Sequence, residues 1–228
     1  MIYGIADLHL DHTGGKCMSV FGKSWHDYEN KIFDNWLALI KDADTVLIPG
    51  DISWGLKLED ALEDLIRIDR LPGKKIILKG NHDYWWQSLK KLKNLGLESI
   101  EFLQNNSYHV ENYNIAGTRG WCSRDSSEFN EGDEVVYKRE LIRLRLSLDS
   151  IKNNDPIIAM LHYPPFNRDR TLNEFGKILE EYKVSTCIYG HLHSEGLSAV
   201  VEGIINSIEY RCISSDYLAF KPILVKGD

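Results

Sequence analysis

Short apolar runs in this chain of 228 residues are repeatedly followed by side chains that can bind a metal ion. The runs at residues 2–6, 45–48, 75–78, 156–161 and 186–189 have the composition of buried β-strands. Two aspartates, an asparagine and five histidines stand just after them: Asp7, His9, Asp51, Asn81, His82, His162, His191 and His193. The carboxyl ends of strands in an open α/β sheet meet along one edge, so we expect these side chains to gather there.

Helical spacing of apolar residues alternates with these runs. It predicts helices at residues 24–40, 58–66, about 83–96, 133–152 and 175–182, the first with Ser24 and Asp27 as an approximate capping box. This alternation indicates βαβ units and a largely parallel sheet. Two further strands are expected within residues 108–116, and antiparallel edge strands within 198–225. Because no linker, repeat or shift in composition interrupts the chain, residues 1–228 are predicted to form one domain.

The overall charge argues against a nucleic-acid partner. The chain carries 27 basic and 34 acidic side chains, a formal net charge of −7. No basic stripe is therefore expected to hold nucleic acid, although bound metal ions would add positive charge locally. Hydrophobic residues make up 43% of the chain, which is enough for a folded core.

Cysteine usage and hydropathy bear on the location of the protein. Cys17, Cys122, Cys187 and Cys212 form no Cys-x-x-Cys pair and are predicted to be reduced thiols. No apolar stretch approaches the ~18 residues that a membrane span needs. The first strand is expected to start at Ile2, which leaves no room for a signal peptide. These features predict a cytoplasmic protein.

The expected ligands are oxygen and imidazole donors without a thiolate. Such a set suits Mn²⁺, Fe, Zn²⁺, Ni²⁺ or Co²⁺ better than Mg²⁺ or Ca²⁺. One carboxylate can bridge two ions, and Asp51 is the candidate because it stands in the middle of the motif order. Two divalent ions with Asp7, Asp51 and a hydroxide leave a net charge of about +1, which favours a phosphate.

The order of the motifs resembles that of the calcineurin-like metallophosphoesterases. The motifs are Asp7-x-His9, Gly50-Asp51, Gly80-Asn81-His82-Asp83, a lone His162 and Gly190-His191-x-His193. The resemblance implies an α/β fold, a four-layer αββα sandwich of two mixed β-sheets flanked by helices. It implies that one metal ion is held by Asp7, His9, Asp51 and His193, and a second by Asp51, Asn81, His162 and His191. His82 would instead lie beside the phosphate and assist the leaving oxygen.

Together these features predict a dinuclear metal-dependent phosphoesterase. A hydroxide that bridges the metal ions would attack a small phosphomonoester or phosphodiester, with Asp51 and His82 as catalytic residues. A nuclease of the same fold and a non-catalytic metal-binding scaffold are the alternatives. The substrate, the native metals and the oligomeric state are left open by the sequence.

Several side chains near the motifs have two interpretations. Arg119, Asn81 and His82 are the predicted substrate-binding residues, Arg119 because a guanidinium pairs well with a phosphate. A structural salt bridge is the alternative for Arg119. Four tryptophans belong either to the core or to the wall of a substrate pocket: Trp54, Trp85, Trp86 and Trp121.

Overall fold

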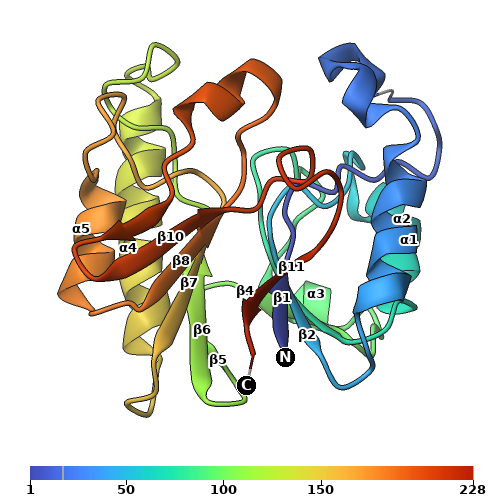
Figure 1. The fold of residues 1–228 in the computed structure, drawn as a ribbon, viewed down its shortest axis with the longest axis horizontal. Helices are drawn as coiled ribbons and strands as arrows, with labels where there is room; N and C mark the ends of the chain where they lie inside the picture. Colours follow the sequence, from blue (N-terminus) through green and yellow to red (C-terminus); the bar gives the residue numbers. More distant parts are fainter. Residues whose placement is uncertain (17, 228) are drawn as a thin grey trace.

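The computed structural model describes residues 1–16 and 18–227, and its layers are two β-sheets packed face to face between two layers of helices (Figure 1). Helices α1, α2 and α3 cover the outer face of one sheet, and α4 and α5 cover the outer face of the other (Figure 1). The predicted α/β fold with two mixed sheets flanked by helices is therefore confirmed.

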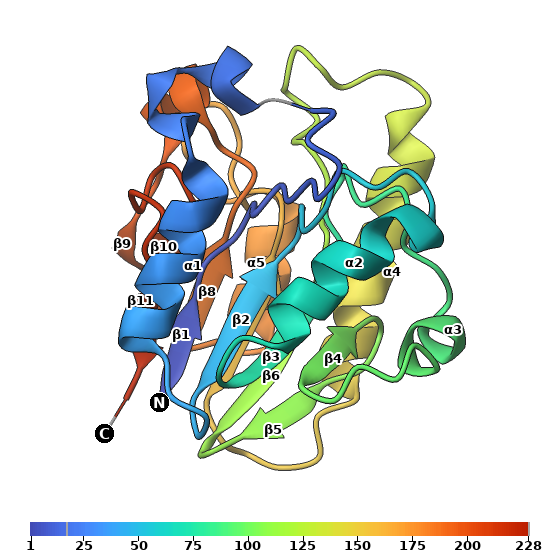
Figure 2. The same cartoon turned by 90° about the vertical axis from the view of Figure 1, so that its right-hand side faces the viewer.

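The first sheet has five strands. In spatial order they are β11 (Ile223–Lys226), β1 (Ile2–Gly4), β2 (Thr45–Pro49), β3 (Lys74–Leu78) and β4 (Ile100–Leu103). All neighbours run parallel except β11, which pairs antiparallel with β1. Its helices are α1 (Tyr28–Leu39), α2 (Leu58–Asp69) and α3 (Leu89–Lys93), and Figure 2 shows α1 and α2 lying in front of this sheet.

The second sheet has six strands. In spatial order they are β5 (Tyr108–Val110), β6 (Tyr113–Thr118), β7 (Ile157–Leu161), β8 (Thr186–Tyr189), β10 (Ile208–Cys212) and β9 (Gly203–Ile205). The four central strands are parallel, whereas β5 and β9 at the edges are antiparallel. Helices α4 (Asp133–Asp149) and α5 (Glu174–Glu181) pack on its outer face, and Asn173 caps α5 by accepting from the Phe175 N–H at 2.9 Å.

The core between the sheets explains the unbroken apolar runs. Leu47 and Ile76 from the first sheet pack with Ile158, Met160 and Ile188 from the second, and all five are buried. Separate apolar clusters lie under the helices on the two outer faces. Central strands covered on both faces need apolar residues at every position, which is why these strands read as continuous runs in the sequence.

Two predicted helices differ from the structure. The first α-helix begins at Tyr28 rather than Ser24, because Asp27 adopts a left-handed φ of 54° and makes no side-chain capping bond. Lys23–Trp25 forms a 3₁₀ turn instead, as does Met18–Phe21. The helix predicted at about 83–96 is shorter in the structure, where it is α3. The Asp83 carboxylate accepts from N–H groups of the preceding loops and does not cap a helix.

The predicted strands in the tail are also partly wrong. β9 and β11 are antiparallel edge strands as expected, but β10 lies inside its sheet and runs parallel to β8. Its register pairs Tyr210 with Cys187. The carboxyl end of β10 therefore reaches the same edge as those of β7 and β8. β4 was not predicted from the sequence.

Cys122, Cys187 and Cys212 are free thiols, which agrees with the prediction for them, whereas Cys17 lies outside the described residues. Within residues 1–16 and 18–227, no helix combines the length and apolar character needed to cross a lipid bilayer.

Candidate metal centre

The predicted ligands lie in loops that follow β1, β2, β3, β7 and β8, at the carboxyl edge of both sheets (the upper edge in Figure 1). Backbone hydrogen bonds tie these loops together. The Asp7 N–H donates to the Gly50 carbonyl at 3.0 Å, and the His9 N–H donates to the Asp51 carbonyl at 2.9 Å. The His191 N–H, which follows β8 of the second sheet, donates to Asp7 Oδ2 at 3.0 Å, so residues from the two sheets meet at one place.

One group of possible metal ligands comprises Asp7, His9 and His193, whose donor atoms lie within 4.8 Å of one another. Asp7 and His9 are buried and have left-handed φ angles of 59° and 46°. Such strain in non-glycine residues persists where the surrounding structure fixes them, as it does at functional sites. The Nε2 atom of His193 lies 3.5 Å from Asp7 Oδ1.

A second group comprises Asp7, Asp51 and His162. Asn81 and His191 adjoin it, because Asn81 Oδ1 lies 2.6 Å from His162 Nε2 and 3.1 Å from His191 Nδ1. Asp7 belongs to both groups in this arrangement. Asp51 touches one histidine of each, since its Oδ2 atom lies 3.7 Å from His9 Nε2 and 3.5 Å from His162 Nε2.

The hydrogen bonding of His162 tests whether a cation fits here. Its Nδ1 lies 3.0 Å from the Pro49 carbonyl, which can only accept, so Nδ1 carries the proton. Nε2 of the neutral ring then presents a lone pair to the Asn81 oxygen, 2.6 Å away. Two acceptors face each other, and a cation bound by both resolves the conflict. Buried His9 Nδ1 and His193 Nε2 likewise have no hydrogen-bond partner among the described residues.

The protonation states of His9, His162 and His191 agree with metal binding. Burial lowers the pKa of His9, His162 and His191 well below the ordinary value, and neighbouring histidines lower it further. These rings are therefore neutral and able to bind a metal ion near neutral pH. Burial lowers the pKa of His193, but the carboxylates of Asp7 and Asp216 outweigh it and raise the pKa to about 10.

The carboxylates of Asp7, Asp51 and Asp83 lie close together and repel one another. Burial raises the pKa of Asp51 well above its ordinary value, and the nearby Asp83 and Asp7 carboxylates raise it further. Ionised carboxylates this close repel one another, and a cation among them relieves that repulsion. The donor set, its burial and its unpaired lone pairs all fit divalent metal ions.

Asp83 shapes the centre without facing it, a role that the sequence analysis missed. Its buried carboxylate accepts from the backbone N–H groups of Asp51 and Gly80 at 2.9 and 2.7 Å. It also accepts from Ile52 and Ser53 and from the Trp85 indole N–H. One side chain therefore fixes the loops after β2 and β3 to each other. Gly80 is required in this loop because a Cβ there would overlap the Asp51 carboxylate.

Asp216 was also missed. Its Oδ1 accepts from His193 Nδ1 at 2.8 Å, which leaves His193 Nε2 to point at Asp7. A carboxylate that orients a histidine in this way is the usual partner of a metal-binding imidazole. Asp216 follows β10 as the other residues follow their strands. The same sequence rule would have found it had β10 been recognised as parallel to β8.

His82 and the tryptophans lie around the centre. The His82 backbone N–H donates to Asp51 Oδ1 at 2.8 Å, and its half-buried ring lies 4.6 Å from that of Trp54. Its ring stands in neither group of possible ligands found among the described residues. Trp54 also stacks on His9 at 4.8 Å, so it lines the centre, whereas Trp85 is wholly buried in the core.

Arg119 and Trp121 lie beside the centre. The Arg119 guanidinium pairs with Glu140 at 3.5 Å and lies over the Trp121 ring, 4.4 Å from its centroid. A structural ion pair is thus present. However, buried Nε of Arg119 has no partner within the described part of the chain, so the pair leaves donor capacity unused.

Comparison with known proteins agrees with this geometry. The sequence model of the family described as calcineurin-like phosphoesterase matches residues 1–195. No curated protein sequence matches the chain.

Solved structures similar to the chain include the phosphopantetheinyl hydrolase of Mycobacterium tuberculosis, with a TM-score of 0.61, 13% identity and coverage of 99% of this chain and 96% of that one. A protein of unknown function from Aquifex aeolicus has a TM-score of 0.52, 19% identity and coverage of 98% and 94%. A protein from Thermus thermophilus has a TM-score of 0.53, 14% identity and coverage of 83% and 80%. At these identities the likeness concerns the fold alone.

Proposed function

The chain belongs to the calcineurin-like phosphoesterase family, and from this premise we propose that it hydrolyses a small phosphomonoester or phosphodiester with two divalent transition-metal ions. The observation that carries the proposal is the pair of facing acceptors, Asn81 Oδ1 and His162 Nε2, 2.6 Å apart beside a cluster of buried carboxylates. Members of this family typically bind divalent metal ions. Mn, Fe, Zn, Ni and Co are the candidates for this donor set.

We assign the two ions to the two sides of Asp51. Asp7, His9, Asp51 and His193 would hold one ion, and Asp51, Asn81, His162 and His191 would hold the other. The contacts of Asp51 Oδ2 with His9 at 3.7 Å and with His162 at 3.5 Å support its role as the shared ligand. When bound, such ions lower the pKa of water toward ~7 and draw charge from the phosphoryl oxygens.

The residues of the chain would supply the other parts of the reaction. The half-buried His82 ring lies 4.6 Å from that of Trp54, and we infer that it gives a proton to the departing oxygen. Asn81, His82 and Arg119 would bind and position the phosphate. Asp51 holds the His82 backbone through Oδ1 while Oδ2 faces the ligands, so one carboxylate ties the proton donor to the centre.

A cavity of about 430 Å³ opens beside His191 and His193 and suits the organic part of a small substrate. Its walls include Phe21, Tyr163 and Phe166. Small-molecule sites combine such apolar walls with a few polar groups. The net charge of −7 speaks against a long nucleic acid as the substrate. We further propose that residues 1–228 form one domain; the cytoplasmic location also stays a prediction.

The proposal is tested by hydrolysis of p-nitrophenyl phosphate and bis-p-nitrophenyl phosphate after addition of each candidate metal. Turnover of at least one ester, dependent on the added metal, is expected. Absence of turnover by protein that holds two ions would contradict the proposal and favour a non-catalytic scaffold. Activity on oligonucleotides that falls steeply with salt would instead indicate a nuclease.

A further inference from the structure

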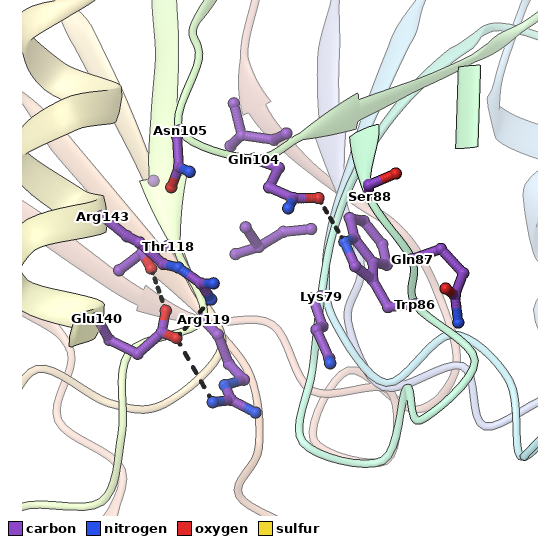
Figure 3. Close-up of a pocket in the computed structure, with 13 residues that line it drawn as sticks. Lys79, Trp86, Gln87, Ser88, Gln104, Asn105, Thr118, Arg119, Glu140 and Arg143 are labelled. Atoms are coloured by element: carbon purple, nitrogen blue, oxygen red, sulfur yellow. Dashed lines mark hydrogen bonds and ion pairs between the residues drawn. The ribbon is translucent and has the colours of Figure 1, made fainter. Parts of the chain in front are cut away.

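A second cavity adjoins the candidate metal centre on the same edge of the sheets. Its volume is about 300 Å³, and residues that line it follow β3, β4 and β6 or lie on α4 (Figure 3). β4 is the next strand beyond β3 in the first sheet, and β6 is the next beyond β7 in the second. The cavity therefore lies one strand along from the metal centre in both sheets.

The lining carries more positive than negative charge. Its charged residues are Lys79, Arg119, Arg143 and Glu140, so the lining has a net charge of +2 in a chain whose net charge is −7. Figure 3 shows the side-chain ends of Lys79 and Arg119 on opposite sides of the same hollow. Positive charge concentrated in a concave site attracts anions.

The ion pairs within the cavity do not use up this charge. Glu140 is almost fully buried, and its Oε1 lies 2.8 Å from an Arg143 nitrogen and 3.5 Å from an Arg119 nitrogen. Its other oxygen accepts from the Thr118 hydroxyl at 2.6 Å. The Lys79 ammonium makes no ion pair or hydrogen bond with any side chain that the structure describes, although the Asp83 and Glu140 carboxylates attract it from a greater distance. Arg139 Nε, outside the cavity, also lies 3.7 Å from Glu140 Oε1. One carboxylate thus pairs with three guanidiniums.

Polar groups without charge complete the wall. Trp86 donates its indole N–H to Gln104 Oε1 at 2.8 Å, so the Gln104 amide nitrogen is the end left for a ligand. Ser88 and Asn105 add further hydrogen-bonding groups. Two guanidiniums, an ammonium and amide donors around a small cavity match the oxygens of a phosphate dianion better than those of a carboxylate, which carries one charge.

Two backbone segments connect the cavity to the metal centre. Lys79 precedes the Gly80-Asn81 turn. The Arg119 carbonyl accepts from the backbone N–H of His162 at 3.1 Å and of Tyr163 at 2.9 Å. We propose that this cavity binds a second phosphoryl group of the substrate, so that the preferred substrate is a phosphate ester with two separate phosphates. The inference rests on the proposed function for the phosphate that reacts.

The test compares each of three diols, ethanediol, butanediol and hexanediol, as its monophosphate and its bisphosphate. We expect kcat/KM for phosphate release to favour at least one bisphosphate over its monophosphate by about tenfold or more. Arg143→Gln should abolish that preference. The control is Arg145→Gln, which alters the same helix at a surface pair with Glu181 and should preserve it. Equal rates at every length, or a preference that survives Arg143→Gln, would overturn the inference.

A binding measurement separates this inference from the proposed function. Sulfate is titrated into the full-length protein in the presence of a chelator, so that metal ions do not contribute. We expect Arg143→Gln or Lys79→Gln to weaken binding by about tenfold, with Arg145→Gln unchanged. Sulfate binding that is unchanged by both Arg143→Gln and Lys79→Gln would overturn the anion site even if esters are hydrolysed. Binding that requires Arg143 in a protein that hydrolyses no ester upholds the anion site and removes the proposed function.

Discussion

The two ends of β3 bury polar groups in opposite ways. Near the amino end, the ammonium of the fully buried Lys75 donates to the carbonyls of Asp69 and Leu71 and to the Ser99 hydroxyl. The three donors of the ammonium each have an acceptor. Past the carboxyl end, Asn81 Oδ1 faces imidazole nitrogens at 2.6 and 3.1 Å, and His9 Nδ1 nearby has no partner within the described ranges.

This difference separates structural from functional polar residues. A buried group that its neighbours satisfy stabilises the fold, whereas leaving one unsatisfied costs about 1–3 kcal/mol. Several such groups at one place therefore indicate a site for a ligand. Asp69 belongs to the first kind, since it accepts from Ser99 and Glu98. In Asp51, by contrast, Oδ1 accepts from the His82 N–H, whereas Oδ2 faces the Nε2 atoms of His162 and His9 at 3.5 and 3.7 Å.

The largest effect is expected from Asp51→Asn, which removes the carboxylate proposed to join both ions. Metal-dependent hydrolysis should fall by at least about 10⁴-fold, because enzymes of this kind owe an acceleration of about 10⁶-fold or more to their catalytic groups. Metal content measured by elemental analysis should fall as well. Asp69→Asn is the control from the amino end. Loss of metal from Asp69→Asn but not from Asp51→Asn would remove the distinction between the two ends.

The next largest effect is expected from His82→Ala. If this ring protonates the leaving oxygen, the rate should fall by about 10²–10⁴-fold while the metal content stays that of the unaltered protein. An ester with a good leaving group, such as p-nitrophenyl phosphate, should suffer less than an alkyl phosphate. An equal loss on both esters speaks against a proton-donor role.

Asp216→Asn tests whether partners outside the ligand set support the centre. Asp216 orients His193 through a bond of 2.8 Å, and replacing such a partner weakens metal affinity by about 10–100-fold. The metal titration that gives this affinity should show a normal stoichiometry at saturating metal. Unchanged affinity would mean that His193 does not depend on Asp216 or does not bind metal.

The smallest effect concerns Lys75 and the pH dependence of stability. Burial lowers the pKa of Lys75 to about 8, against the attraction of Asp69 and Asp42, from an ordinary value of 10.5. Between these values the unfolded chain binds the proton and the folded chain does not, so this group makes stability rise with pH. The free energy of unfolding should increase from pH 8 to pH 10 by about 1–3 kcal/mol more than that of Lys75→Met. Parallel curves for the two proteins would refute the shift.

Site residues that directly follow apolar strands could be predicted from the sequence. Site residues whose position depends on how the strands and loops pair could not. Asp7, His162 and His191 follow strands that are apolar throughout, so the parallel-sheet rule placed them together. Asp216 escaped because β10 has alternating burial and resembles an edge strand, although it pairs parallel with β8. The role of Asp83 also escaped, because a carboxylate that gathers five N–H groups from two loops leaves no periodic pattern.

The cavity lined by Lys79, Arg119 and Arg143 could not be predicted from the sequence for a related reason. Its residues come from β3, β4, β6 and α4, and β4 itself was not predicted. Of these residues, only Arg119 was singled out from the sequence. Whether its guanidinium binds a phosphate or forms a structural salt bridge depends on contacts that only the fold reveals. In the structure, the Arg119 guanidinium pairs with Glu140, and its Nε has no hydrogen-bond partner among the described residues.

Anomalous diffraction from crystals grown with Mn²⁺ or Zn²⁺ locates each ion, and so shows whether Asp51 lies between two of them. Two peaks are predicted, one among Asp7, His9 and His193 and one among Asn81, His162 and His191, with the Asp51 carboxylate in contact with both. A single peak, or two peaks of which Asp51 touches only one, would contradict the account.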